Sequence, residues 1–164
     1  MSGRRITLAI TSDLQNVPLI GQAVERLCSL IPLSDVESHQ IALCVCEAVN
    51  NAIVHGYGRE AEHQVEVIFG HYPDHLILQI CDTGRTMDPK HLGPQMASPL
   101  DFDPCHLECI PEKGLGLAII RRTMDEVTYT TSQGKNILTL TRFLKPCQAK
   151  EEEGGGVTDV EQEA

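Results

Sequence analysis

Residues 44–58, with the sequence CVCEAVNNAIVHGYG, contain the most informative pattern in this 164-residue chain. They complete a predicted helix whose N-terminal cap is Ser34, because Glu37 stands at capping-box distance from that serine. The helix ends at His55 and Gly56, since glycine readily forms the C-terminal turn of a helix. Apolar side chains recur on one face of the helix, at Ile41, Val45, Ala48 and Ala52. The pattern therefore predicts a long helix packed against a core.

Glu47 and Asn51 lie four residues apart on this helix, so their side chains project from the same face about one turn apart. A carboxylate and a carboxamide in that arrangement can serve a single site. Their neighbours Ala48, Val49 and Ala52 are small or apolar, which indicates a packed helix whose polar pair faces a cleft. The alternative is a solvated Glu and Asn on a helix surface.

The sequence on either side of this helix predicts a sheet with further helices. A first helix is expected to end near Ile31, before Pro32, and to be capped by Ser12–Asp13 or, if it starts later, by Asn16. A last helix is predicted at residues 114–124. The predicted strands are residues 4–11, 64–70, 75–81, 126–132 and 136–143. We therefore expect an α+β fold, a two-layer sandwich with helices on one face of a largely antiparallel sheet.

A second motif, Asp82-Thr83-Gly84, directly follows the predicted strand 75–81. A carboxylate at the end of a strand can accept a hydrogen bond from an exocyclic amine such as that of adenine. Glycine allows the backbone to approach a flat ligand closely. The alternative is an ordinary turn, because Asp-x-Gly is common in turns.

A third motif, Gly114-Leu115-Gly116-Leu117, opens the last predicted helix beyond a Pro- and Gly-rich segment at residues 87–113. Glycines at a helix start can present backbone N–H groups to phosphate oxygens, and Lys113 could add a counter-charge. The alternative is a flexible entry into the helix. The chain has no GxxxxGK[ST] sequence, which excludes a P-loop protein.

These three motifs, in this order, resemble the GHKL ATPase superfamily, whose ATP-binding domain has the Bergerat fold with an asparagine box and two glycine boxes. The sequence of residues 44–58 is most similar to the anti-sigma factor serine/threonine kinases of that superfamily. The resemblance covers roughly residues 5–144. Two positions depart from the family pattern. Thr86 stands where many relatives have a second glycine, and Asn50 stands at the usual threonine, where it could turn outward or join the site.

The resemblance implies a role for each motif. Asn51 would hold Mg²⁺, Glu47 would be the general base, and Asp82 would bind the adenine amine of ATP. Residues 90–113 would form a lid over the nucleotide. The remaining residues expected at the nucleotide are His55, Gly84, Lys113, Gly114, Leu115, Gly116 and Leu117.

The resemblance also implies a function. We expect an ATP-dependent serine/threonine protein kinase that phosphorylates a STAS-type anti-anti-sigma protein, binds a sigma factor or another regulator, and forms a homodimer. One alternative is a non-catalytic, ATP-gated module that sequesters its partner without phosphorylating it. Another, the detached catalytic domain of a histidine kinase, is disfavoured because no phospho-acceptor helical hairpin is expected before the first strand.

Composition sets the domain limits and excludes some partners. Residues 148–164 contain six acidic side chains and one lysine, so they carry −5 of the formal charge of −10 and the rest of the chain carries the other −5. We expect one ATP-binding domain at residues 4–144 and a disordered acidic tail at 145–164. Without clustered Lys and Arg, neither nucleic acid nor an anionic membrane is an expected partner.

Seven cysteines accompany an N-terminal apolar run that is too short for a secretory signal, which predicts reduced thiols and a cytoplasmic protein. No apolar stretch approaches the roughly 20 residues that a membrane-spanning helix needs. Cys44 and Cys46 are expected to be small core residues. The sequence CHLEC at residues 105–109 suggests zinc, but no second cluster completes a tetrahedral set.

Overall fold

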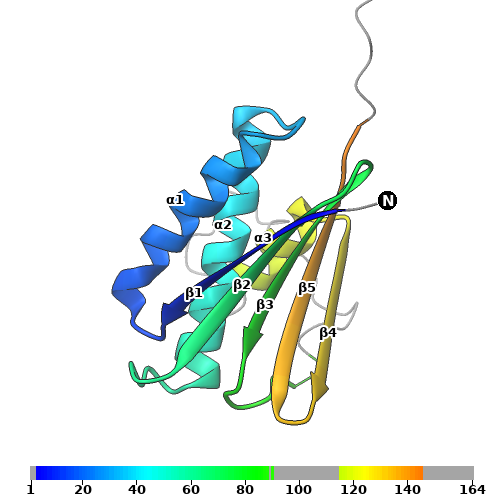
Figure 1. Cartoon of the computed structure of the whole chain (residues 1–164). Helices are drawn as coiled ribbons and strands as arrows, with labels where there is room; N and C mark the ends of the chain where they lie inside the picture. The colour runs from blue at the N-terminus through cyan, green and yellow to red at the C-terminus, as the bar shows by residue number, and fades with distance from the viewer. Residues whose placement is uncertain (1–2, 89, 91–114, 146–164) are drawn as a thin grey trace, which may run out of the picture.

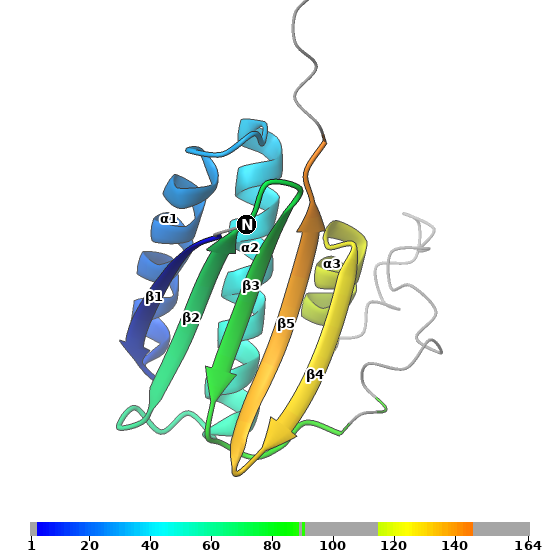
Figure 2. The ribbon, with the colours of Figure 1, turned by 45° about the vertical axis from the view of Figure 1, so that its right-hand side comes forward.

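The computed structural model describes residues 3–88, 90 and 115–145. The described chain forms two layers, with the helices packed on one face of a five-stranded sheet (Figures 1 and 2). No described element covers the other face of the sheet, which is turned toward the viewer in Figure 2. This arrangement confirms the predicted α+β sandwich.

The sheet has the strand order β1-β2-β3-β5-β4, and every neighbouring pair is antiparallel. Its strands are β1 (Arg4–Thr11), β2 (Gln64–His71), β3 (His75–Asp82), β4 (Glu126–Ser132) and β5 (Lys135–Phe143). Gln133 and Gly134, between β4 and β5, have φ angles of 52° and 75°. Positive φ at both positions is typical of the tight turns that match the twist of a hairpin. All five strands lie within a residue of their predicted limits.

The helices are α1 (Val17–Cys28), α2 (Asp35–Asn51) and α3 (Leu115–Thr123). The predicted capping box is confirmed, because Ser34 and Glu37 bond each other's backbone N–H groups at the start of α2. Of the two expected caps, the structure has Asn16 at the N-cap of α1, although its side chain makes no capping bond. Asp13 accepts a hydrogen bond from Gln15 and so caps a short 3₁₀ turn at Leu14–Asn16, and α1 starts only after that turn. The end of α1 lies earlier than predicted, at Cys28.

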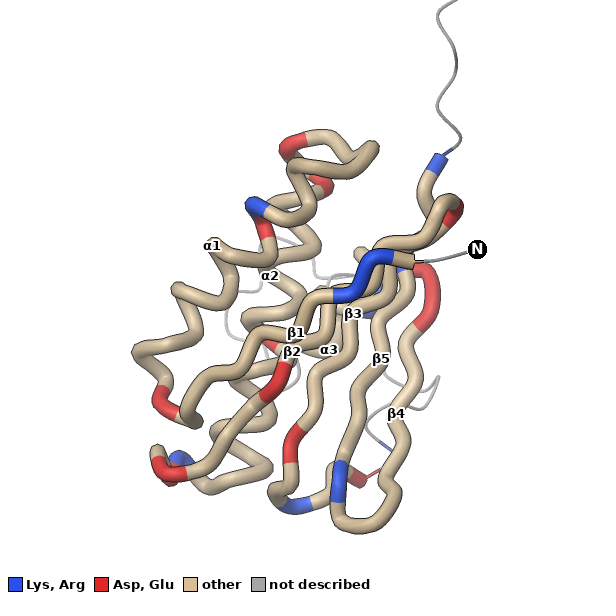
Figure 3. Tube along the Cα trace, viewed as in Figure 1, with Lys and Arg blue, Asp and Glu red and all other residues tan. Residues whose placement is uncertain are grey.

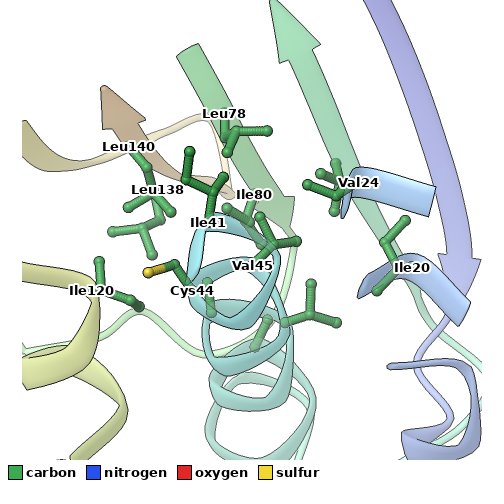
Figure 4. Packing of buried hydrophobic residues seen from close by; sticks show 14 of the residues in the cluster. Ile20, Val24, Ile41, Cys44, Val45, Leu78, Ile80, Ile120, Leu138 and Leu140 are labelled. Carbon is green, nitrogen blue, oxygen red and sulfur yellow. The ribbon is translucent and has the colours of Figure 1, made fainter. Parts of the chain in front are cut away.

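The core lies between the helices and the sheet, and Figure 4 shows α2 at its centre. Side chains from α1, α2, α3, β3 and β5 meet there, among them Ile20, Val24, Ile41, Val45, Leu78, Ile80, Ile120, Leu138 and Leu140. Cys44 is fully buried in this cluster, as expected for a core thiol, whereas Cys46 is half-buried. A Cβ at Gly21 would lie 2.5 Å from the Cys46 sulfur, so the glycine allows α1 to approach α2 closely.

The end of α2 has an unusual last turn. Residues Ala52–Gly56 form a π-helical turn in which the N–H of Tyr57 donates to the carbonyl of Ala52 at 3.0 Å. The helical segment therefore ends at Gly56, as predicted, but with a wider turn than an α-helix. Single π-helical turns within helices occur frequently at functional sites, because they redirect the side chains around them.

Charged residues of both signs are spread over the ends of the helices and strands (Figure 3). None of the helices within the described ranges has the length and apolar character that crossing a lipid bilayer requires.

Candidate functional site

A cavity of about 470 Å³ opens where the end of α2 meets β3, β5 and the first turn of α3. This volume is in the range of small-molecule binding sites. The cavity is lined by Ala48, Asn51, Ala52, His55, Gly56, Ile80, Asp82, Arg85, Thr86, Met87, Asp88, Gly116, Leu117, Tyr129 and Leu138. All three sequence motifs therefore contribute to one cavity.

The α2 side of the cavity contains Asn51 and the exposed His55. Asn51 is half-buried, and its side chain makes no hydrogen bond to any described residue. Its amide is therefore available to a ligand. Asn50, for which the sequence left two orientations open, does not line the cavity.

Glu47 lies at the rim of the cavity, against α3. It is not among the lining residues, but a Cβ at Gly116 would lie 2.5 Å from Glu47 Oε2 and 3.4 Å from Glu47 Cβ. The absence of a side chain at Gly116 thus allows the first turn of α3 to rest on Glu47. The carboxylate is half-buried and has no hydrogen-bond partner within the described part of the chain. It lies one helical turn from Asn51 on the same side of α2.

Two thiols flank Glu47 on α2 without taking part in the cavity. Burial raises the pKa of Cys44 to about 11, and burial together with the charge of Glu47 raises the pKa of Cys46. Both side chains are therefore protonated near neutral pH and are poor nucleophiles or metal ligands.

The opposite side of the cavity is formed by the turn after β3. Asp82 Oδ1 accepts hydrogen bonds from the N–H of Gly84 and from Asn136 Nδ2, both at 2.9 Å. Gly84 does not line the cavity. A Cβ at Gly84 would lie 2.5 Å from the carbonyl carbon of Gly56 and 2.6 Å from the carbonyl oxygen of Gly56. The backbone N–H of Arg85 donates to the same Gly56 oxygen at 2.8 Å. Gly84 is required because two backbone segments meet at this point.

Sequence reasoning missed three polar residues that hold this turn. Tyr57 donates its hydroxyl to the carbonyl of Gln64 and accepts from the N–H of Thr83, both at 2.8 Å. Tyr129 accepts from the N–H of Met87 at 3.0 Å. Asn136 is buried beneath Asp82. A signal for Asn136 was present, since strand alternation places it on the same face as the core residues Leu138 and Leu140.

Several expected residues lie outside the described part of the chain. They are Lys113, Gly114, the CHLEC sequence at 105–109 and all of the predicted lid except Lys90. Leu115 begins α3 and Leu117 lines the cavity. Within residues 3–88, 90 and 115–145, no group of three or more His, Cys, Asp or Glu side chains is arranged to hold a metal ion.

The cavity offers two chemical environments. On the side of Asp82 the lining combines polar residues with apolar or aromatic ones, and the latter suit a flat ring bearing a hydrogen-bond donor. The polar residues are Arg85, Thr86 and Asp88, and the apolar or aromatic ones are Ile80, Met87, Tyr129 and Leu138. Toward α2 and α3 the lining includes the polar side chains of Asn51 and His55 and the backbone of Gly116, beside the apolar Ala48, Ala52 and Leu117. This end suits a charged, oxygen-rich group.

Comparisons with known proteins find a matching family model and similar relatives. The profile of the family described as "Histidine kinase-like ATPase domain" matches residues 10–142. The serine-protein kinase RsbW of Bacillus cereus (strain ZK / E33L) is 30% identical over 127 residues, which cover 77% of this chain and 75% of that relative.

Two solved structures share the fold. The RsbU and RsbW domains of Rv1364c from Mycobacterium tuberculosis superpose with a TM-score of 0.58 and 14% identity, over 85% of this chain and 32% of that one. The SiaB–SiaC complex from Pseudomonas aeruginosa contains a chain that matches with a TM-score of 0.54 and 14% identity, over 85% of this chain and 89% of that one.

Proposed function

This chain belongs to the histidine kinase-like ATPase domain family, together with the RsbW serine-protein kinases, and from that premise we propose that it is an ATP-dependent serine/threonine protein kinase. Its substrate would be a STAS-type anti-anti-sigma protein, and it would act as an anti-sigma factor or a similar switch. One observation is central: Asn51, Asp82 and Gly116 line a single cavity, with Glu47 against Gly116 at its rim.

In this proposal ATP would occupy the cavity with its adenine ring toward Asp82. The adenine ring would lie between the apolar walls, with its 6-amino group donating to Asp82, and the phosphates would extend toward Asn51 and the start of α3. Residues 4–144 would then form the ATP-binding domain. His55, Leu117 and, beyond the described residues, Lys113 and Gly114 would surround the phosphates.

The side chains present suit a magnesium ion. Asn51 brings to the cavity an amide oxygen that no described residue binds, and Mg²⁺ prefers such hard oxygen ligands while retaining waters and phosphate oxygens. When bound, Mg²⁺ neutralises charge on the transferred phosphoryl group.

The chemical step needs a base beside the acceptor hydroxyl. The Glu47 carboxylate would take the proton of the substrate's serine hydroxyl. At the same time the serine oxygen would form a bond to the γ-phosphorus of ATP, the bond from that phosphorus to the bridging oxygen would break, and ADP would leave. Asn51 lies one turn away on α2, so one helix would position both the metal ligand and the base. The expected assemblies are a complex with the STAS-type substrate, a homodimer and a complex with a sigma factor.

The test is transfer of labelled phosphate from Mg-ATP to a STAS-domain protein encoded beside this chain. We expect acid-stable product, typical of phosphoserine or phosphothreonine. Glu47→Gln should reduce transfer by about a hundredfold or more while leaving ATP binding intact. Glu62→Gln, an exposed carboxylate in a turn away from the cavity, is the matched control.

Two outcomes would replace this proposal. If the chain binds ATP but transfers no phosphate to any such partner, the kinase assignment fails. If Glu47→Gln keeps full control of the partner in the cell, transfer is dispensable and the protein works as an ATP-gated sequestering module.

A further inference from the structure

Asn136 is a buried polar residue within an apolar strand. It is only 1% exposed, is the second residue of β5, and stands directly across from Asp82 of β3 in the sheet register. It does not line the cavity, whereas Asp82 does. Burying a carboxamide costs free energy unless its hydrogen bonds are made, so its presence here needs a reason.

The Asn136 side chain uses its full hydrogen-bonding capacity. Its Nδ2 donates to Asp82 Oδ1 at 2.9 Å and to the carbonyl of Gly84 at 3.0 Å. Its Oδ1 accepts from Thr131 Oγ1 at 2.9 Å and from Thr86 Oγ1 at 3.3 Å. A carboxamide has two donors and two acceptor lone pairs, and all four are satisfied.

These partners also fix which way the amide points. An ionised carboxylate and a backbone carbonyl can only accept hydrogen bonds, so the nitrogen must face Asp82 and Gly84. The two threonine hydroxyls can donate, so the oxygen faces them. The flipped amide would place its oxygen against two acceptors, which makes the observed orientation the only satisfied one.

The consequence for Asp82 is that its two oxygens differ. Oδ1 is held from one side by the N–H of Gly84 and from below by Asn136. Oδ2 has no hydrogen bond to any described residue. With Oδ1 fixed, rotation of the carboxylate is restricted, and Oδ2 is the acceptor that remains for a group in the cavity.

We propose that Asn136 is a positioning residue that orients Asp82 for a purine bearing a 6-amino group, and thereby sets the base preference of the site. This inference rests on the proposed function, since it assumes a nucleotide in the cavity. Asn136 acts through Asp82 and does not touch the base. Because it also bonds the Gly84 carbonyl, it fixes the carboxylate and the turn after β3 as one unit.

The experiment compares two nucleotides that differ only at the recognised group. ATP and purine riboside triphosphate, which lacks the 6-amino group, are titrated against the full chain, and the ratio of their dissociation constants is measured. A hydrogen bond to a charged acceptor makes wild type prefer ATP by about tenfold to a hundredfold. In Asn136→Ala the ratio is expected to fall to within about threefold of unity, because the carboxylate is no longer oriented.

Two further variants separate positioning from folding. Asn136→Val also lacks the amide, but its β-branched side chain suits a strand and fills similar space, so it provides a second folded protein. Thr131→Val is the matched control, because it removes one bond to Asn136 Oδ1 and leaves both Nδ2 bonds in place. Loss of stability alone would weaken both nucleotides equally and leave the ratio unchanged.

The assignment is supported if the ratio of dissociation constants falls toward unity in both Asn136 variants and stays at the wild-type value in Thr131→Val. It is also supported if adding Asn136→Ala to Asp82→Ala causes no further change in this ratio. A wild-type ratio in the Asn136 variants overturns it, and so does an equal collapse in Thr131→Val. A wild-type chain that binds neither nucleotide defeats the proposed function itself, and with it this inference.

Discussion

At one end of the cavity, Asp82 lines the wall, and Gly84 and Asn136 lie behind it and hold its Oδ1; we call these three residues the base end, and apart from Asp82 Oδ2 their side-chain polar groups are hydrogen-bonded within the protein. At the other end, formed by Glu47 and Asn51 and called the phosphate end, neither side chain has a hydrogen bond to a described residue. Asp82 at the base end and Asn51 at the phosphate end line the same cavity. The two ends differ in how much of their bonding capacity the fold itself uses.

This difference follows from burial. Asn136 is excluded from solvent, and an unmet hydrogen bond there would cost about 1–3 kcal/mol, so folding requires its partners. Glu47 and Asn51 are only half-buried, so the fold does not require partners for them from within the protein. Recognition of a rigid base benefits from acceptors fixed in advance, whereas a metal and a reacting hydroxyl need groups that the fold leaves available. Substitutions at the two ends should therefore affect different properties.

The largest expected effect is at the phosphate end. Asn51→Ala should reduce phosphate transfer by about a hundredfold or more, because the proposed magnesium ligand is lost. The free energy of unfolding should change by less than about 0.5 kcal/mol, since no hydrogen bond within the described chain is broken. Transfer is measured as a function of magnesium concentration, and stability by urea unfolding.

Asn50→Ala is the matched control for that experiment, because Asn50 is adjacent on α2, also half-buried and absent from the cavity lining. It should keep nearly full transfer. If the two variants lost activity alike, or if Asn51→Ala unfolded the protein, the distinction between the two ends would not hold.

A smaller effect is expected at the base end, where the quantity that changes is the free energy of unfolding. Gly84→Ala should destabilise the fold by about 1–3 kcal/mol, because its Cβ would overlap the backbone of Gly56, which cannot move aside as a side chain can. Gly56→Ala probes the same contact from the other side. There the nearest atom to the new Cβ would be Asp82 Oδ1 at 3.4 Å, so little loss of stability is expected. Urea unfolding of both variants tests this difference. Equal losses of stability in Gly84→Ala and Gly56→Ala would contradict the close approach of Gly84 to the Gly56 backbone.

Much of this site could be predicted from the sequence because its motifs are local. The capping box of Ser34 and Glu37, the strand before Asp82 and the shared face of Glu47 and Asn51 all depend on residues within one or two turns of each other. Their meeting in one cavity was expected only through family resemblance, since no periodicity specifies which strand neighbours which helix.

The contacts that were missed join distant parts of the chain. Asn136 reaches Asp82 across 54 positions and Tyr57 reaches Thr83 across 26, and nothing near either residue in sequence indicates its partner. The later start of α1, which the sequence left as an alternative, has a local cause, because Asp13 bonds the N–H of Gln15 and forms a 3₁₀ turn first. The π-helical end of α2 was also not expected, since hydrophobic periodicity does not distinguish it from an α-helical turn.

The smallest effect is expected at the far end of α2, about ten residues and therefore roughly 15 Å from Glu47. The backbone N–H and hydroxyl of Ser34, followed by the guanidinium of Arg142, hold the pKa of Glu37 below its ordinary value of 4.5. A carboxyl whose pKa is lower in the folded state stabilises the fold above its unfolded pKa, and this contribution disappears as the pH falls through the folded pKa. Wild type should therefore lose stability below about pH 4.5 in part through Glu37.

Glu37→Gln isolates that contribution, because glutamine can still accept the capping bond from Ser34 but carries no charge. At pH 7 the variant should be less stable than wild type by up to about 1 kcal/mol, and the difference should shrink toward zero as the pH is lowered past the folded pKa of Glu37. ATP affinity at pH 7 should be the same in both proteins, because neither end of the cavity contacts Glu37. If Glu37→Gln weakened ATP binding, the cap of α2 and the cavity would be coupled. ATP affinity would then depend on more than the contacts within the base and phosphate ends.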